Sequence, residues 1–174
     1  MKPQSIATYL LVAGLLLASV VLGQARPAAA QDQPGRLQRI TERLQPGETH
    51  AYLLEDLQAG DQLTVSMQAT SGNLDPAVGI IDTSAPLEEF GTSYRADLQR
   101  ALAAEEGVAE AIAAVRNESF LAWDDDSGDG YAAALTYIVP NAGDYVLIAG
   151  GALSTFGRAT AGDYTLGILS LIHI

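Results

Sequence analysis

The sequence predicts an all-β protein, an antiparallel β-sandwich interrupted by a helical segment at about residues 86–118. Seven short segments carry β-branched, aromatic or alternating apolar residues, and turn residues separate them. Only the segment 86–118 breaks this pattern, because its apolar residues recur at helical spacing. The chain has 174 residues and no cysteine, so the hydrophobic core of one domain must hold this fold without disulfides.

The first half of the predicted sandwich follows a polar lead-in. Residues 31–47 are rich in Gln, Arg and Pro, which indicates a linker or a short helical lead-in. Strands are predicted over residues 50–57, 62–68 and 77–81. The second is the clearest, because Leu63, Val65 and Met67 alternate with polar residues. This alternation is typical of an antiparallel sheet with one buried and one solvated face.

The inserted segment is predicted to be a helical hairpin or a kinked helix. Its apolar residues at roughly helical spacing are Leu98, Leu102, Val108, Ile112 and Val115. The Ala, Glu, Arg and Gln residues around them have high helix propensity. We expect Thr92 or Ser93 to cap the start of the segment and Gly107 to interrupt its middle.

Four further strands are predicted after the insertion, over residues 119–123, 131–139, 145–149 and 164–168. The motif Gly-Asp-Tyr-Val-Leu at 143–147 recurs as Gly-Asp-Tyr-Thr-Leu at 162–166. A short turn, Pro-Asn-Ala-Gly at 140–143, precedes the first copy. The repeat predicts two antiparallel neighbouring strands joined by the loop 150–161.

Residues 1–30 are predicted to form a secretory signal peptide. Lys2 precedes an uncharged and mostly apolar run over 6–23, and three alanines at 28–30 provide a cleavage site before Gln31. The alternative is an uncleaved membrane anchor, for which 18 residues are barely long enough. The sequence therefore predicts a secreted or extracytoplasmic protein.

The last six residues, 169–174, match one reading frame of a transposase-end adapter used in sequencing libraries. On this interpretation they are not biological, and the natural chain continues beyond Ile168. The alternative is a short last strand formed by the leucines and isoleucines of this tail. The sandwich domain itself is predicted to span residues 48–168.

The charge of the predicted mature chain limits its partners. Residues 1–30 contain Lys2 and Arg26 but none of the 21 acidic residues, so the remainder keeps seven arginines and a net charge of −14. Nucleic acids and anionic membranes require a basic surface. We therefore expect no nucleic-acid partner, and membrane contact only if the leader is retained or the chain continues.

The order of motifs between residues 45 and 168 resembles that of the bacterial pre-peptidase C-terminal domain. The matching segments are 45–48 (QPGE), 59–65 (AGDQLTV), 73–76 (NLDP), 124–126 (DDD), 140–145 (PNAGDY) and 162–166 (GDYTL). Such domains are secreted β-sandwiches of jelly-roll type that accompany exported enzymes, and some related domains in collagenases bind calcium and substrate. Similar domains also occur outside the membrane in larger signalling proteins. The resemblance implies a jelly-roll-like sandwich, from whose usual short connection the insertion at 86–118 departs.

The acidic loop between two predicted strands is the candidate metal site. Its oxygen ligands are Asp124, Asp125, Asp126 and Asp129. Glycines at 128 and 130 allow the loop to fold around an ion, so calcium is the predicted cofactor. Asp75 or Asp82 is a candidate for a further ligand from a neighbouring strand. The alternative is a solvated turn whose carboxylates cap backbone amides.

Candidate catalytic groups are few. His173 belongs to the predicted tail, so a serine–histidine–acid triad could use only His50, which we expect to be an exposed strand residue. Cysteine is absent and the mature chain has no lysine, which excludes thiol and Schiff-base catalysis. No catalytic residue is assigned, and the chain is not predicted to be an enzyme.

The predicted function is a non-catalytic exported module that binds or stabilises, assisted by calcium. Its expected partner is an extracellular ligand or a downstream domain of the same chain. The alternatives are the ligand-sensing outer domain of a truncated membrane signalling protein and, third, a secreted hydrolase. A set of aromatic residues is predicted to pack in the core rather than bind carbohydrate: Tyr52, Trp123, Tyr131, Tyr137, Tyr145 and Tyr164.

Overall fold

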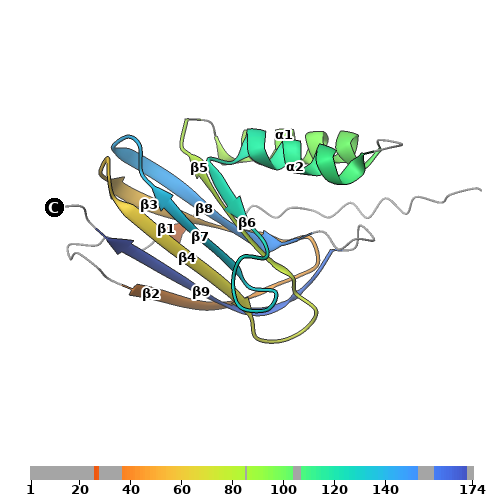
Figure 1. Cartoon of the computed structure of the whole chain (residues 1–174), viewed down its shortest axis with the longest axis horizontal. Helices are drawn as coiled ribbons and strands as arrows, with labels where there is room; N and C mark the ends of the chain where they lie inside the picture. Colours follow the sequence, from red (N-terminus) through yellow and green to blue (C-terminus); the bar gives the residue numbers. More distant parts are fainter. Residues whose placement is uncertain (1–25, 28–36, 85, 104–106, 153–158, 172–174) are drawn as a thin grey trace, which may run out of the picture.

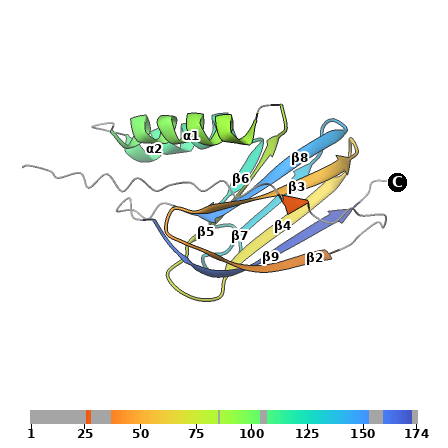
Figure 2. The same ribbon diagram turned by 180° about the vertical axis from the view of Figure 1, so that it is seen from behind.

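The fold is a two-sheet sandwich with a layer of two helices on one side (Figures 1 and 2). It is seen in a computed structural model that describes residues 26–27, 37–84, 86–103, 107–152 and 159–171. Sheet A contains, in spatial order, β1 (Arg26–Pro27), β3 (Thr49–Leu57), β8 (Gly143–Gly151), β5 (Pro76–Asp82) and β6 (Ala122–Asp124). Sheet B contains β2 (Leu37–Leu44), β9 (Gly162–Leu171), β4 (Gln62–Ala69) and β7 (Ala133–Ile138). The helices are α1 (Leu87–Leu102) and α2 (Val108–Ser119).

The strands from β2 to β9 are nested. Strand β2 pairs with β9, β3 with β8, β4 with β7 and β5 with β6, and every one of these pairs is antiparallel. Successive strands alternate between the two sheets as far as β5, and this order is that of a jelly roll. The predicted jelly-roll-like sandwich with a helical insertion is therefore confirmed. The insertion occupies the innermost connection, between β5 and β6.

The main core lies between the two sheets. In β4, Leu63, Val65 and Met67 are buried while their polar neighbours are not, which confirms the predicted alternation. Strands β8 and β9 add Tyr145 and Tyr164, and the latter is among the largest fully buried side chains. Burial of this apolar surface is the dominant stabilising term in a chain without disulfides.

The helices cover the outer face of sheet A, and this contact forms a second, smaller core. The buried strand residues of this core are Ala51, Ile81, Val146 and Ile148. Leu87, Phe90 and Phe120 pack against them from the helical layer. The predicted helices are confirmed, and Gly107 precedes α2 in a left-handed conformation. The prediction that Thr92 or Ser93 caps the start of the insertion is wrong. Helix α1 begins directly after Pro86, and the Thr92 hydroxyl donates to the Glu88 carbonyl inside it.

Strand β2 lies where a linker or helical lead-in was expected, so the sandwich begins near residue 37 rather than 48. Its inward positions include the polar Glu42 as well as Ile40 and the fully buried Leu44. Because polar Glu42 occupies an inward position, the sequence of β2 lacks the alternation of apolar and polar residues that would predict a strand. At the other end of the chain β9 continues to Leu171, within the segment expected to be a tail.

The two Gly-Asp-Tyr strands are not neighbours, contrary to the prediction. Strand β8 lies in sheet A and β9 in sheet B. Each copy instead places a tyrosine, Tyr145 or Tyr164, into the same core from opposite sides. The predicted leader falls almost entirely outside the described residues. Within the described part of the chain, no helix has the length and apolar character that crossing a membrane requires.

Candidate functional site

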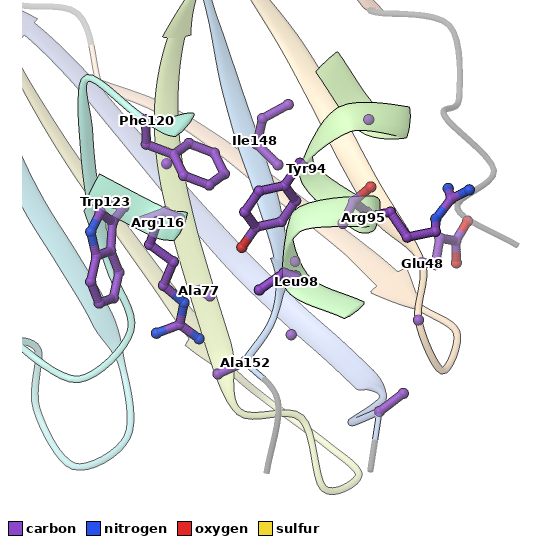
Figure 3. Close-up of a pocket in the computed structure, with 18 of the residues that line it drawn as sticks. Glu48, Ala77, Tyr94, Arg95, Leu98, Arg116, Phe120, Trp123, Ile148 and Ala152 are labelled. Atoms are coloured by element: carbon purple, nitrogen blue, oxygen red, sulfur yellow. The ribbon is translucent and has the colours of Figure 1, made fainter. Parts of the chain in front are cut away.

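A pocket of about 330 Å³ lies between the helical layer and the outer face of sheet A. Figure 3 shows its labelled residues, with Phe120 and Trp123 at one end and Arg95 and Glu48 at the other. Small residues of two strands line part of its floor, Ala77 and Gly79 of β5 and Gly150 and Gly151 of β8, beside larger strand residues such as Ile148 and Trp123. The helix side contributes larger groups from α1, mainly Phe90, Tyr94, Leu98 and Leu102. Small residues facing large ones leave a gap that the packed layers do not fill.

The aromatic end of the pocket joins the helices to the sheet. Phe120 packs against Phe90 and Tyr94, with ring centroids 5.4 and 5.2 Å away. The Phe120 ring lies over Gly79, where a Cβ atom would be only 2.4 Å from the ring. Glycine at this position of β5 therefore allows the helical layer to approach the sheet.

Arg116 of α2 forms the polar corner beside this cluster. Its guanidinium lies 4.6 Å from the centre of the Trp123 ring, and its Nη1 donates to Asp125 Oδ2 at 2.7 Å. The Trp123 indole in turn donates to Asn117 Oδ1 at 2.9 Å. Burial raises the pKa of the Tyr94 phenol, and the nearby Arg116 guanidinium opposes that rise. Arg116 is thus held by an ion pair and an aromatic face.

Arg95 of α1 lies at the opposite end and has a different environment. Its Nε is buried, and no hydrogen-bond partner for it lies within the described part of the chain. Glu48 is the carboxylate among the described residues that line the pocket. Its Oε2 accepts from the backbone amide of Gln45 at 2.8 Å, and its Oε1 lies 3.5 Å from His50 Nε2. Glu48 Oε2 is therefore bound by a backbone amide, and Oε1 lies near His50.

The acidic loop follows β6, and its carboxylates are divided between several contacts. Asp124 Oδ2 accepts from the amides of Ser127 and Ala134, at 3.0 and 2.7 Å. Asp125 pairs with Arg116, whereas Asp126 and Asp129 are exposed. Among the described residues, no group of three or more acidic or histidine side chains is placed to hold a metal ion. The calcium site stays a prediction.

Asp75 is linked electrostatically to this loop, and Asp82 is not. Burial, together with the charges of Asp126 and Asp125, raises the pKa of the Asp75 carboxyl, while Arg116 lowers it. Its Oδ1 is buried and has no hydrogen-bond partner in the described chain. By contrast, hydrogen bonds from the Ser84 side chain and amide lower the pKa of Asp82.

These opposite shifts predict opposite mutational effects. A raised pKa means that folding favours the protonated Asp75, so the free energy of unfolding falls as pH rises from 3.8 through the folded-state pKa. Above that window the cost is complete, and we expect Asp75→Asn to raise the free energy of unfolding at pH 7 by about 0.5 kcal/mol. Asp82→Asn is the control and should lower it, because its carboxylate is stabilised at neutral pH. Urea titrations at pH 7 and pH 3 measure both effects; a destabilised Asp75→Asn variant at pH 7 would contradict the assignment.

His50 is not the exposed strand residue that was expected. Its side chain is 19% exposed, and its Nδ1 lies 2.6 Å from the Tyr164 hydroxyl and 2.9 Å from Glu42 Oε2. Tyr52 shares this network, with its hydroxyl 2.5 Å from that of Tyr164. The described partners of His50 are tyrosines and glutamates rather than a serine. The network links β3 of one sheet to β2 and β9 of the other.

The aromatic residues divide into three groups. Tyr52, Tyr145 and Tyr164 are buried in the core, as predicted, and Tyr137 packs against it. The prediction that Tyr131 packs in the core is wrong, because 78% of this residue is exposed. Trp123 is half-buried beneath Arg116 and lines the pocket.

The pocket residues of the insertion were not identified from the sequence. Tyr94, Arg95, Arg116 and Phe120 looked like ordinary helix and strand residues. The available signal was the presence of three arginines and two aromatic residues, Phe90 and Tyr94, in a segment otherwise rich in Ala and Glu. Their convergence depends on which face of sheet A the insertion covers, which no local pattern specifies.

The similarities to known proteins reported below are distant. No protein-family model and no curated protein matches the sequence. Among solved structures, the chain is similar to PliG from Aeromonas hydrophila, a periplasmic inhibitor of g-type lysozyme. The two are 13% identical, the match covers 83% of this chain and 93% of that one, and the TM-score is 0.49.

A second similar structure is CorA of Methylomicrobium album BG8, a surface-associated copper-binding protein. It is 12% identical, with 76% of this chain and 92% of that chain covered and a TM-score of 0.39. Both TM-scores lie below 0.5, and neither similarity assigns a function to this chain. Neither protein is a pre-peptidase C-terminal domain, and that resemblance stays a prediction.

Proposed function

We propose that this protein is a non-catalytic, exported binding module whose ligand occupies the pocket between the helical layer and sheet A. The observation that carries the proposal is the pocket itself, about 330 Å³ in volume and lined on both sides by small or apolar residues. Ligand sites in proteins are typically concave and mostly apolar, with a few polar groups, and measure about 300–1,000 Å³. The pocket has these properties.

The arrangement of the layers supports a binding role. Sheet A supplies a floor whose backbone is fixed on its other face by the main core. The roof is an insertion that the sandwich topology does not require, placed in the innermost connection of the jelly roll. Among the described lining residues the titratable groups are Glu48, Tyr94 and two arginines. Such a set suits recognition of a ligand by its shape and charge.

Export and calcium assistance are parts of this proposal that rest on the sequence. The leader at 1–30 supports export, and the acidic loop supports calcium. The same pocket would serve the alternative, an outer sensing domain of a membrane signalling protein. The binding module and the sensing domain both require a ligand in the pocket, so the experiment tests whether the pocket binds one.

Substitution of Ala77 tests the site. Ala77 and Gly79 alternate with the core residues Val78 and Ile80, so these two residues lie on the face of β5 that is directed toward the helices. We expect Ala77→Phe to fill the cavity and to weaken binding of the neutral fluorophore N-phenyl-1-naphthylamine at least tenfold. The measurement is fluorescence titration, with circular dichroism to establish that the variant is folded.

The control for Ala77→Phe is Thr136→Phe, which adds the same ring to an exposed position of β7 in sheet B. It should bind the fluorophore as the parent does. A parent protein that does not bind the probe, or a folded Ala77→Phe variant that binds it normally, would refute the proposed site.

A further inference from the structure

We propose that the pocket selects an organic monoanion with an apolar body, such as a medium-chain carboxylate, and that Arg95 binds its charged group. This inference rests on the proposed function and names the ligand class. It is carried by the contrast between the two arginines that line the pocket. Arg116 pairs with Asp125 and lies over the Trp123 ring, whereas the Nε of Arg95 is buried and has no acceptor among the described residues.

The state of Arg95 points to a missing acceptor. A buried N–H group without a hydrogen bond is unfavourable, and more so when it carries positive charge. No ion pair to Arg95 occurs among the described residues, whereas Arg116 has Asp125 at 2.7 Å. Arg95 is among the residues that line the space a ligand would enter. A carboxylate at this end of the pocket would accept a charge-assisted hydrogen bond from the Arg95 guanidinium.

The carboxylate among the described residues of the pocket lining does not take this role. Glu48 lies at the same end of the pocket as Arg95 (Figure 3). Its Oε2 accepts from the Gln45 amide, its Oε1 lies 3.5 Å from His50 Nε2, and no described ion pair joins it to Arg95. Among the described residues, Arg95 therefore has no counter-ion.

The charge distribution favours an anion over a cation or a neutral molecule. The chain carries a formal net charge of −12, yet the described charged groups of the pocket are two arginines and one glutamate. A cationic ligand would meet Arg95 and Arg116 and would find only Glu48. A neutral apolar ligand would leave the Arg95 guanidinium without a counter-ion among the described residues. One guanidinium that has no described ion pair matches one negative charge.

The apolar lining defines the rest of the ligand. Phe90, Leu98 and Ile148 present hydrocarbon surface along the pocket. A cavity of about 330 Å³ is at the small end of the range for ligand sites, which suits a single chain or ring system with one charged end. Decanoate is a suitable probe, and decanol is its neutral counterpart with the same chain.

Isothermal titration of both probes tests the inference. The parent should bind decanoate at least tenfold more tightly than decanol. Arg95→Gln should weaken decanoate binding about tenfold or more and leave decanol binding unchanged, because only the charge-assisted hydrogen bond is lost. Arg100→Gln is the matched control. Arg100 lies on the same helix, is exposed, pairs with Asp97 and does not line the pocket, so this variant should bind both probes as the parent does.

The outcomes separate the two proposals. Equal affinity of the parent for decanoate and decanol, or an equal loss of both in Arg95→Gln, would overturn the role of Arg95 while the pocket stands. Binding of N-phenyl-1-naphthylamine without binding of decanoate would do the same. If none of the three probes binds the folded parent, the proposed function fails together with the inference.

Discussion

Gly162→Ala is expected to lower the free energy of unfolding by about 3 kcal/mol, because the added Cβ has no room. It would lie 2.0 Å from the carbonyl oxygen of Ser71 and 3.0 Å from its carbonyl carbon. The Ser71 segment cannot move away easily, since the amides of Thr70 and Ser71 both donate to the Asp163 carbonyl. Insertion of a methyl group into a site fixed on both sides typically costs 1–3 kcal/mol, and a backbone clash lies at the top of that range.

The repeated Gly-Asp-Tyr motif provides the control for this prediction. Gly143 begins β8 with φ 153°, close to the 159° of Gly162, but nothing lies within 4 Å of a Cβ at position 143. Any cost of placing alanine at this φ is shared by both variants, so their difference isolates the clash. Urea titration should show Gly143→Ala losing about 2 kcal/mol less. Equal losses would refute the steric explanation.

Local patterns in the sequence were sufficient for most of the regular elements, although not for β2. The alternation of Leu63, Val65 and Met67 predicts β4 because each side of a strand has one environment. The helical spacing from Leu98 to Val115 predicts the insertion for the same reason. In β4 one face packs and the other meets solvent, whereas in the insertion Leu102 is exposed and α2 contains no fully buried residue. The jelly-roll order of the strands was predicted from the resemblance to the pre-peptidase C-terminal domain, because no single segment of the sequence specifies it.

The errors arise where a partner far away in the sequence decides the environment. Strand β2 has no clear hydrophobic pattern, because the polar Glu42 occupies an inward position. Its carboxylate is tolerated there because it contacts Tyr52 and His50 of the next strand. The two Gly-Asp-Tyr strands carry identical local signals, yet nesting sends them to opposite sheets. Neither fact can be read from a window of a few residues.

The candidate site also combines features that a local sequence pattern shows with features that only the tertiary structure creates. The acidic loop was visible as a cluster, but the ion pair of Asp125 with Arg116 and the influence of Asp126 on Asp75 depend on tertiary structure. The pocket was not visible at all. It exists because small residues of β5 and β8 face large residues of α1, and these segments come together only in the folded chain.

The attachment of the helical layer to sheet A depends on Phe120. Its ring contacts Phe90 and Tyr94 of α1 and covers Gly79 of β5, so it connects the roof of the pocket to the floor. Removal of a large buried aromatic side chain costs about 3–5 kcal/mol. Because Phe120 is half-buried, we expect Phe120→Ala to lower the free energy of unfolding by about 2–3 kcal/mol. Leu121→Ala, at an exposed neighbouring position, should have a much smaller effect.

A double-mutant cycle with Gly79 tests whether the contact itself is responsible. Gly79→Ala alone should cost about 2 kcal/mol, because the three nearest atoms to its Cβ, 2.4 to 3.1 Å away, all belong to the Phe120 ring. In the Phe120→Ala background that obstacle is gone, and alanine is otherwise preferred to glycine in a strand, so the same change should cost about zero. The expected coupling is therefore about 2 kcal/mol, measured by urea unfolding of the four proteins. Additive losses would show that Phe120 stabilises the protein elsewhere, and that the helical layer is held to the sheet without it.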